Sequence, residues 1–106
     1  MVTACAQQGD ILWLEKEEQY VLVLSREFFN QSGMSVVCPL RDNANPDALH
    51  IRISSDAYNG AALLEHLRSL DLQARHYRRI SGISYEQVQN ISDAVQGIFD
   101  YYPYSV

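Results

Sequence analysis

The sequence predicts an α+β fold in which a small antiparallel β-barrel or sheet is followed by one docked helix. The chain has 106 residues, of which 47% are hydrophobic, so we expect a single domain over 1–106 with a buried core. Short apolar runs separated by turn residues fill its first half, which predicts strands. An amphipathic pattern near its end predicts a helix that comes after them.

Two apolar runs near the N-terminus predict the first pair of strands. The first run covers 11–15, and the second covers 20–25 and is rich in β-branched residues. A run that is apolar throughout is typical of a strand buried on both faces, and we expect this of the second run. Only the short charged segment 15–19 separates the two runs, which favours a tight hairpin.

The next segments predict a helical turn, a strand and a loop. A turn of helix is expected over 26–30, because the sequence Gln31-Ser32-Gly33 ends it. A third strand is expected over 34–40, with Pro39 near its end, where a missing N–H costs least. Residues 42–47 are rich in Asp and Asn, which is typical of a loop.

The middle of the chain contains one clear strand and one ambiguous segment. Residues 49–53 alternate, with His50 and Arg52 on the face opposite the apolar side chains, which indicates a half-exposed strand. The segment 57–70 has two interpretations. Its propensity favours helix, whereas its side-chain alternation is also compatible with a strand.

The last element is an amphipathic helix. Ser84 and Gln87 have the spacing of a capping box, with Ser84 as N-cap and Gln87 reaching back to it. Apolar side chains then recur at helical intervals, at Val88, Ile91, Val95, Ile98 and Phe99. Pro103 cannot continue a helix, so we expect this one to end near residues 100–102.

Charge argues against one broad class of function. The net charge of −5 disfavours sequence-independent nucleic-acid binding, which relies on neutralising many phosphates. Basic residues gather within 68–79 and acidic residues within 15–18. Each cluster alone is interpreted as a solvated surface.

Cysteine usage and hydropathy predict the compartment. Cys5 and Cys38 lie far apart with no histidine at ligand spacing, so neither a metal site nor a cofactor is expected. Cys38 lies within an apolar run and is interpreted as a small core residue. No apolar run approaches the roughly 20 residues of a membrane span, and residues 1–5 lack a basic leader, so we expect a cytoplasmic protein.

The order of four segments resembles the MazF/PemK family of toxins, and the resemblance covers nearly the whole chain. The segments are GDILWL at 9–14, VLVLSREFFNQSG at 21–33, VVCPL at 36–40 and LRSLDLQAR at 67–75. The helix after RISGISYEQV also fits the ending of the family. The resemblance implies an SH3-like antiparallel β-barrel with a C-terminal amphipathic helix, and it favours a strand over 62–70.

The resemblance also implies a function. It suggests the toxin of a type II toxin–antitoxin module, a metal-independent endoribonuclease that cleaves single-stranded mRNA. The implied partners are single-stranded RNA, a cognate antitoxin protein and a second copy of the chain in a homodimer, with no membrane association and no cofactor. The substrate groove would lie between the two subunits.

The chain departs from the family at both of its usual catalytic positions. Gln19 stands where an arginine is expected, and Arg41 stands where threonine or serine is common. Glu65 matches a position that is Asp in some members, and Arg68 matches a residue common in the family. Arg41 and Glu65 are therefore the candidate catalytic residues.

Metal-free RNA cleavage needs a base for the 2′-OH, an acid for the leaving oxygen and cations for the phosphate. Arg41 could pair with phosphate, Glu65 could act as the base, and His66 is the strongest general-acid type nearby. In a continuous strand, however, Glu65 and His66 would point to opposite faces. The candidate substrate-binding residues are His50, Arg52, His66 and Arg68.

Structural interpretations stand beside these roles. Arg41 could simply be a surface residue beside Asp42, Glu65 could pair with Arg68, and His50 and Arg52 could form a solvated face. Aromatic side chains of the tail could stack on bases or pack on the barrel; these are Tyr101, Tyr102 and Tyr104.

The short 15–19 hairpin keeps a second class of function open. A binding protein on the same scaffold would resemble CcdB toxins, which poison DNA gyrase without cutting RNA. A non-catalytic relative that still binds an antitoxin-like peptide is a third interpretation, because a basic peptide suits an acidic surface.

Overall fold

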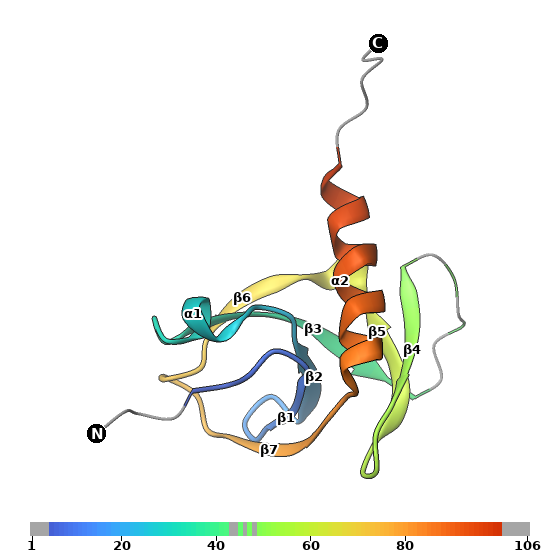
Figure 1. Cartoon of the computed structure of the whole chain (residues 1–106). Helices are drawn as coiled ribbons and strands as arrows, with labels where there is room; N and C mark the ends of the chain where they lie inside the picture. The colour runs from blue at the N-terminus through green and yellow to red at the C-terminus, as the bar shows by residue number, and fades with distance from the viewer. Residues whose placement is uncertain (1–4, 43–44, 46, 48, 101–106) are drawn as a thin grey trace.

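A curled antiparallel sheet with one long helix beside it forms the body of the computed structural model, which describes residues 5–42, 45, 47 and 49–100 (Figure 1). The elements in chain order are β1 (Asp10–Leu14), β2 (Gln19–Val23), α1 (Glu27–Asn30), β3 (Met34–Arg41), β4 (His50–Ser54), β5 (Asn59–Leu63), the 3₁₀ turn η1 (Leu64–His66), β6 (Arg68–Asp71), β7 (Tyr77–Gly82) and α2 (Tyr85–Phe99). The sheet curls into a half-barrel, so the predicted α+β barrel with a C-terminal helix is confirmed. The tail tyrosines, and 43, 44 and 46 of the expected loop, lie outside the described residues.

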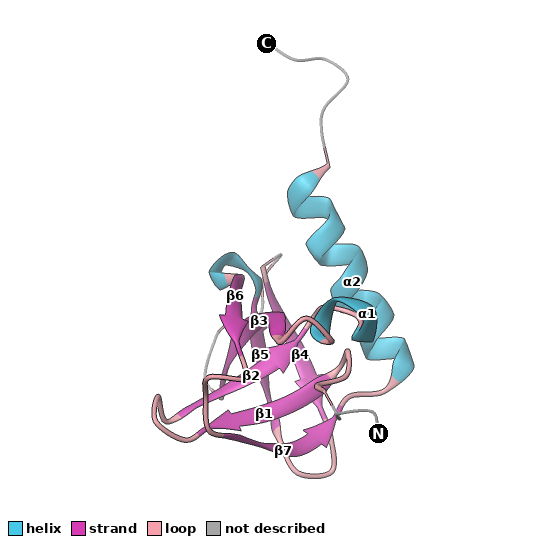
Figure 2. Cartoon of the chain, turned by 90° about the vertical axis from the view of Figure 1, so that its left-hand side faces the viewer, coloured by secondary structure: helices cyan, strands magenta, loops and turns pink. Residues whose placement is uncertain are grey.

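Strand β3 organises the sheet. The strand order is β4-β5-β3-β2-β1-β7, and β6 pairs with β3 off this path. Along one edge of β3, its first half, from Met34 to Val37, pairs with β6, and its last two residues pair with β5. β5, η1 and β6 therefore form one interrupted path that runs antiparallel to β3 (Figure 2).

Strands β1 and β2 are buried on both faces, which explains their unbroken apolar sequences. Ile11 and Leu22 pack in one core cluster together with Ile91 of α2. Their chain neighbours Leu12 and Val21 pack in a second cluster, because successive side chains of a strand point to opposite faces. The prediction of a central strand buried on both faces is therefore confirmed for β2.

Helix α2 begins at the predicted N-cap. The Ser84 hydroxyl accepts a hydrogen bond from the Gln87 N–H at 3.3 Å, and the Gln87 side-chain amide donates to the same oxygen at 3.2 Å. That amide also pairs with the backbone of Ser54, donating to its carbonyl at 2.9 Å and accepting from its N–H at 2.7 Å. Hydrogen bonds of Gln87 thus link the start of the helix to the end of β4.

The second half of α2 extends beyond the sheet (Figure 1), and Phe99 at its end is 72% exposed. Within the described ranges, no helix has the length and apolar character that a membrane span requires.

The segment 62–70 is not the continuous strand that the resemblance favoured. β5 ends at Leu63, one turn of 3₁₀ helix follows, and β6 starts at Arg68. The physical reason lies at Leu64, which is completely buried in the core that faces α2. The turn directs the side chain of this leucine into the core and leaves Glu65 and His66 exposed.

Strand β7 was not predicted, because its sequence YRRISG is short and polar. It pairs with β1 across a register shift between Ile11 and Leu12, so its side chains do not alternate regularly along the partner strand. Its arginines form ion pairs instead of packing in the core, with Arg79 Nε 2.9 Å from a carboxylate oxygen of Asp10.

The basic and acidic clusters of the sequence face each other. Arg78 Nε lies 3.2 Å from a carboxylate oxygen of Glu15, and Arg75 pairs with Glu17. Both clusters were interpreted as separate solvated surfaces, whereas the β1–β7 pairing brings them together. These arginines therefore have protein carboxylates as their partners.

Candidate functional site

A cavity of about 800 Å³ lies where β3 ends, between the β1–β2 hairpin and the β4–β5 pair, and we call it the β3-end cavity. Its lining includes Trp13, Gln19, Tyr20, Arg41, Asp42, His50, Tyr58, Glu65 and His66. Most of the candidate residues from the sequence thus line one cavity. Across the part of the chain that the structure describes, no group of three or more His, Cys, Asp or Glu is placed to hold a metal ion.

A histidine–carboxylate pair forms the polar centre of this cavity. His50 Nε2 lies 2.5 Å from a Glu65 carboxylate oxygen, and His50 Nδ1 lies 3.0 Å from the Asn45 carbonyl. Because a carbonyl only accepts, Nδ1 carries a proton. The side chains remain partly open to solvent, with 22% of His50 and 34% of Glu65 exposed.

The contact between His50 and Glu65 shifts the pKa of each side chain toward its charged form. The Glu65 hydrogen bond, followed by the Asn45 carbonyl, raises the pKa of His50 above its ordinary 6.5. Partial desolvation alone would raise the pKa of Glu65, but the His50 hydrogen bond and nearby imidazoles outweigh it, so that pKa falls below its ordinary 4.5. The contact therefore favours an imidazolium that donates to a carboxylate over the neutral pair.

The 3₁₀ turn η1 brings Glu65 and His66 into the same cavity. In a continuous strand, the two side chains would have pointed to opposite faces and could not have shared a site. The turn breaks the two-residue alternation of a strand, so this obstacle does not apply. The register of β4 and β5 pairs His50 with Leu63, which explains how His50 reaches Glu65.

Arg41 and Gln19 lie on the β2–β3 side of the cavity. Arg41 is the exposed last residue of β3, and no ion pair engages it within the described ranges. The Gln19 amide donates to the carbonyls of Tyr20 at 2.7 Å and of Leu40 at 3.1 Å. The Gln19 side chain therefore holds the backbone just before Arg41.

Two predicted substrate-binding residues, Arg52 and Arg68, do not line the β3-end cavity. Both are exposed, Arg52 on β4 and Arg68 at the start of β6. The alternative pairing of Glu65 with Arg68 is wrong, because the partner of Glu65 is His50.

Aromatic side chains form one wall of the cavity, and sequence reasoning missed this. The Trp13 and Tyr20 ring centroids are 4.7 Å apart, and those of Tyr20 and Tyr58 are 4.8 Å apart. Trp13 and Tyr20 are direct partners in the β1–β2 register. Deriving the register of this hairpin from the sequence would therefore have predicted their contact. Burial and a hydrogen bond to Asp42 raise the pKa of Tyr58, so its phenol stays neutral.

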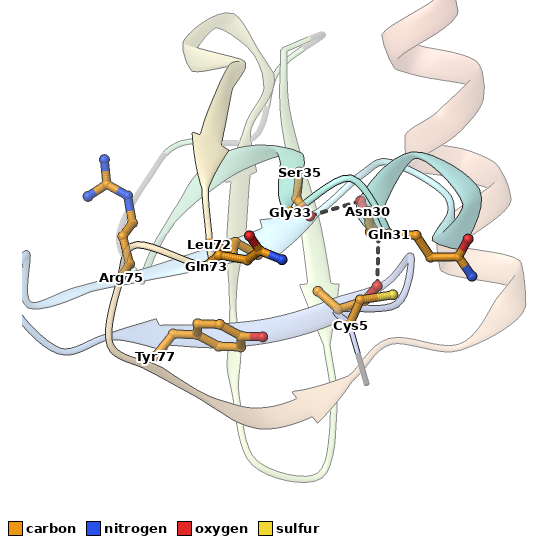
Figure 3. Close-up of a pocket in the computed structure, with 10 residues that line it drawn as sticks. Cys5, Asn30, Gln31, Gly33, Ser35, Leu72, Gln73, Arg75 and Tyr77 are labelled. Carbon is orange, nitrogen blue, oxygen red and sulfur yellow. Dashed lines mark hydrogen bonds between the residues drawn. The ribbon is translucent and has the colours of Figure 1, made fainter. Parts of the chain in front are cut away.

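A second cavity of about 450 Å³ lies between α1, the N-terminal segment and the β6–β7 connection (Figure 3). Its buried polar residues are Asn30 and Ser35. Asn30 donates to the Ala6 and Ser25 carbonyls at 2.7 and 2.9 Å. The Asn30 oxygen also accepts from the Ser35 hydroxyl at 2.8 Å and from that of Ser25. Because its hydrogen-bonding groups are used within the protein, Asn30 is a structural residue rather than a ligand-binding one.

Comparisons with known proteins indicate a family and a fold. The model of a family described as PemK-like, MazF-like toxin of type II toxin–antitoxin system matches residues 7–99. No curated protein matches the chain significantly.

Several solved structures share the fold. A MazE–MazF structure from Deinococcus radiodurans is 20% identical, with a TM-score of 0.81, and the alignment covers 92% of this chain and 98% of that one. An endoribonuclease from a mycobacterial species is 12% identical, with a TM-score of 0.80, covering 97% and 100%. A structure of an endoribonuclease in complex with its cognate antitoxin, from a mycobacterial species, is 13% identical, with a TM-score of 0.77, covering 92% and 99%.

Proposed function

The chain belongs to the family of PemK-like, MazF-like toxins of type II toxin–antitoxin systems, and we propose that it is a metal-independent endoribonuclease that cleaves single-stranded RNA. The observation that carries this proposal is the convergence of Arg41, His66 and the His50–Glu65 pair in one cavity. These are the side-chain types that phosphodiester transfer needs for proton movement and charge stabilisation.

Glu65 is the proposed general base. One carboxylate oxygen accepts the His50 hydrogen bond at 2.5 Å, and a carboxylate has enough lone pairs to accept the ribose 2′-OH as well. The 2′-oxygen then bonds to phosphorus while its proton passes to Glu65. The lowered pKa of Glu65 keeps the carboxylate ionised, and it also makes Glu65 a weaker base than a group whose pKa lies near the operating pH.

His50 is proposed as a positioning residue. Both of its ring nitrogens are engaged, one by the Asn45 carbonyl and one by Glu65. It therefore has no free donor for a phosphate and acts by orienting Glu65. This assigns His50 a different role from the substrate-binding role predicted from the sequence.

Arg41 and His66 complete the proposed reaction. Arg41 presents a guanidinium that can pair with two phosphate oxygens and stabilise the charge of the phosphorane-like transition state. His66, when protonated, donates a proton to the 5′-oxygen as its bond to phosphorus breaks. The products would be a 2′,3′-cyclic phosphate and a free 5′-hydroxyl.

A cognate antitoxin and a second copy of the chain are the proposed protein partners. Family membership supports an antitoxin, and structures that share this fold include a MazE–MazF structure and an endoribonuclease with its cognate antitoxin. The exposed apolar end of α2, where Ile98 is 39% and Phe99 is 72% exposed, offers a surface for protein contact.

Glu65→Gln tests the proposed chemistry. We expect the wild-type protein to cleave a long mixed-sequence RNA in the presence of EDTA, and the variant to be roughly 10²- to 10⁴-fold slower because the base is lost. Asp93→Asn is the matched control, since Asp93 is an exposed carboxylate on α2 outside the cavity. Cleavage is followed by gel electrophoresis, and the 2′,3′-cyclic phosphate end by mass spectrometry.

One result would replace this proposal with the binding alternative. That result is a protein that leaves RNA intact in EDTA and yet slows growth when it is expressed. A CcdB-like action on a protein target would then account for the toxicity. Gln19, at the position where cleavage would call for a free arginine, is bonded to backbone carbonyls instead. This observation favours the binding alternative.

A further inference from the structure

We propose that the aromatic wall of the β3-end cavity, formed by Trp13, Tyr20 and Tyr58, is a subsite on which one nucleobase of the RNA strand stacks. The inference rests on the proposed ribonuclease function and adds how the enzyme would hold the strand beside Glu65. Stacking on aromatic rings is a sequence-tolerant way to bind single-stranded nucleic acid, because every base has a π-face.

The rings form a continuous row across two strand pairs. Trp13 of β1 and Tyr20 of β2 are tilted by 57°, and Tyr20 and Tyr58 are tilted by 47°. Trp13 and Tyr20 are half-buried and line the cavity, so part of each ring stays accessible. Tyr58 is only 8% exposed and packs against Tyr20.

Tyr58 of the aromatic wall is held in place before any ligand binds. A Cβ atom at Gly60 would lie 2.7 Å from the Tyr58 hydroxyl, so the glycine makes room for the phenol. The backbone of Tyr58 is held by Ser55, whose hydroxyl accepts from the Tyr58 N–H at 3.0 Å. A preformed aromatic surface loses little conformational entropy on binding.

The polar groups beside the wall favour a nucleobase over an aliphatic peptide side chain. Arg41, Asp42 and Gln19 line the same cavity. Arg41 can donate to a base edge or to its phosphate, whereas the Asp42 carboxylate and the Gln19 side-chain oxygen can accept from a base edge. An aliphatic occupant would bury the Arg41 guanidinium without a partner, which is costly. A base offers an apolar face to the rings and polar atoms to the remaining lining.

Trp13 makes the subsite measurable, because it is the only tryptophan of the chain. The full-length protein would be titrated with a short random-sequence 2′-O-methyl RNA, which cannot be cleaved because its 2′-oxygen is blocked. An abasic oligonucleotide of equal length supplies the same phosphates without bases. We expect the RNA to quench Trp13 fluorescence, and the abasic strand to bind roughly 5- to 100-fold more weakly without quenching.

Substitutions at Tyr20 give a second measurement. Tyr20→Leu removes the stacking face and is expected to weaken 2′-O-methyl RNA binding roughly 5- to 100-fold, whereas Tyr20→Phe keeps the face and most of the affinity. Tyr85→Leu is the matched control, because Tyr85 is 75% exposed on α2 and lies outside the cavity. Affinity is measured by fluorescence anisotropy of a labelled strand, and circular dichroism checks the folding of each variant.

Several results would overturn the subsite. These are equal binding of the abasic strand, RNA binding that leaves Trp13 fluorescence unchanged, and no RNA binding at all. Quenching by an apolar peptide but not by RNA would assign the wall to a protein side chain instead. The ribonuclease proposal fails separately, if unmodified RNA stays intact while the 2′-O-methyl strand still quenches Trp13.

Discussion

At the scale of single residues, the His50–Glu65 contact links the charge of the cavity to the stability of the fold. The folded-state pKa of His50 lies above its ordinary 6.5, so the pair stabilises the protein below pH 6.5 and loses this effect as pH rises through the raised pKa. The folded-state pKa of Glu65 lies below its ordinary 4.5, so its contribution is present above pH 4.5 and disappears as pH falls through the lowered pKa. The contact is therefore most stabilising between pH 4.5 and 6.5.

His50→Gln tests this window. We expect the variant to be less stable than the wild type between pH 4.5 and 6.5, and the difference to shrink on either side, because the ion pair exists only where both groups are charged. Urea unfolding followed by circular dichroism across the pH range measures the difference. A difference that is constant from acid to alkaline pH would contradict the prediction, and His76→Gln, at an exposed histidine outside the cavity, is the control.

The same variant separates a positioning role from a merely structural one. Without His50 the pKa of Glu65 should rise, because the largest influence that lowers it is the His50 hydrogen bond. We expect the acid limb of the kcat/KM profile for RNA cleavage to move to higher pH in His50→Gln. A profile that keeps its shape while losing height would show that His50 only supports the fold.

Sequence reasoning could find some of these residues but not their contacts. Arg41, Glu65 and His66 were reached through their positions in segments that resemble a family and through the chemistry of their side chains. The His50–Glu65 pair depends on the register that sets His50 opposite Leu63, and that register follows from a hairpin rather than from a motif. The aromatic wall depends in the same way on the β1–β2 register.

At the scale of elements, the apolar strands and the helix were predictable, whereas the polar and interrupted strands were not. β1, β2 and β3 are apolar because both of their faces are buried, and α2 carries a capping box and a helical apolar pattern. β7 lacks this pattern because its arginines bond to carboxylates. The strand is interrupted at η1 because Leu64 packs in the core. This is a tertiary contact, which local propensity does not predict.

The packing of α2 against the start of β1 gives a prediction for this scale. Gly9 has a φ of +92°, and a Cβ atom there would lie 2.8 Å from Val88 Cγ2 of the helix. Gly9→Ala should therefore destabilise the protein by about 2 kcal/mol or more, from backbone strain and from displacement of α2. Urea unfolding measures this loss.

Gly97→Ala is the matched control within the same helix. Nothing lies within 4 Å of a Cβ atom placed at Gly97, so alanine meets no obstacle there. It should stabilise the protein by up to about 1 kcal/mol through helix propensity. If the two substitutions changed the free energy of unfolding equally, α2 would not pack against Gly9 as closely as the contacts indicate.

At the scale of the whole molecule, the distribution of charge limits how RNA can be bound. The chain carries a net charge of −5, and Arg75, Arg78 and Arg79 are engaged by carboxylates of the β1–β2 side. Three arginines of the basic cluster thus already have protein carboxylates as partners. Arg41 lines the β3-end cavity, and no ion pair engages it among the described residues, so we expect it to be the main cation for the substrate.

The salt dependence of RNA binding measures how many cations take part. For single strands, the logarithm of the binding constant falls with the logarithm of salt concentration by roughly 0.7 for each phosphate contact. If only Arg41 and a protonated His66 contact phosphate, the slope per chain should be about −0.7 to −1.4. If Arg52 and Arg68 also contact phosphate, as the sequence suggested, the slope should approach about −2.8.

We expect the shallow slope, because Arg52 and Arg68 lie outside the β3-end cavity. Titrations of 2′-O-methyl RNA at a series of salt concentrations measure it. Arg41→Gln should reduce its magnitude by about 0.7, whereas Arg52→Gln and Arg68→Gln should leave it unchanged. A steep slope that becomes shallow on replacing Arg52 or Arg68 would mean that the strand leaves the cavity along β4 or β6, and the path of the substrate over the protein would have to be redrawn accordingly.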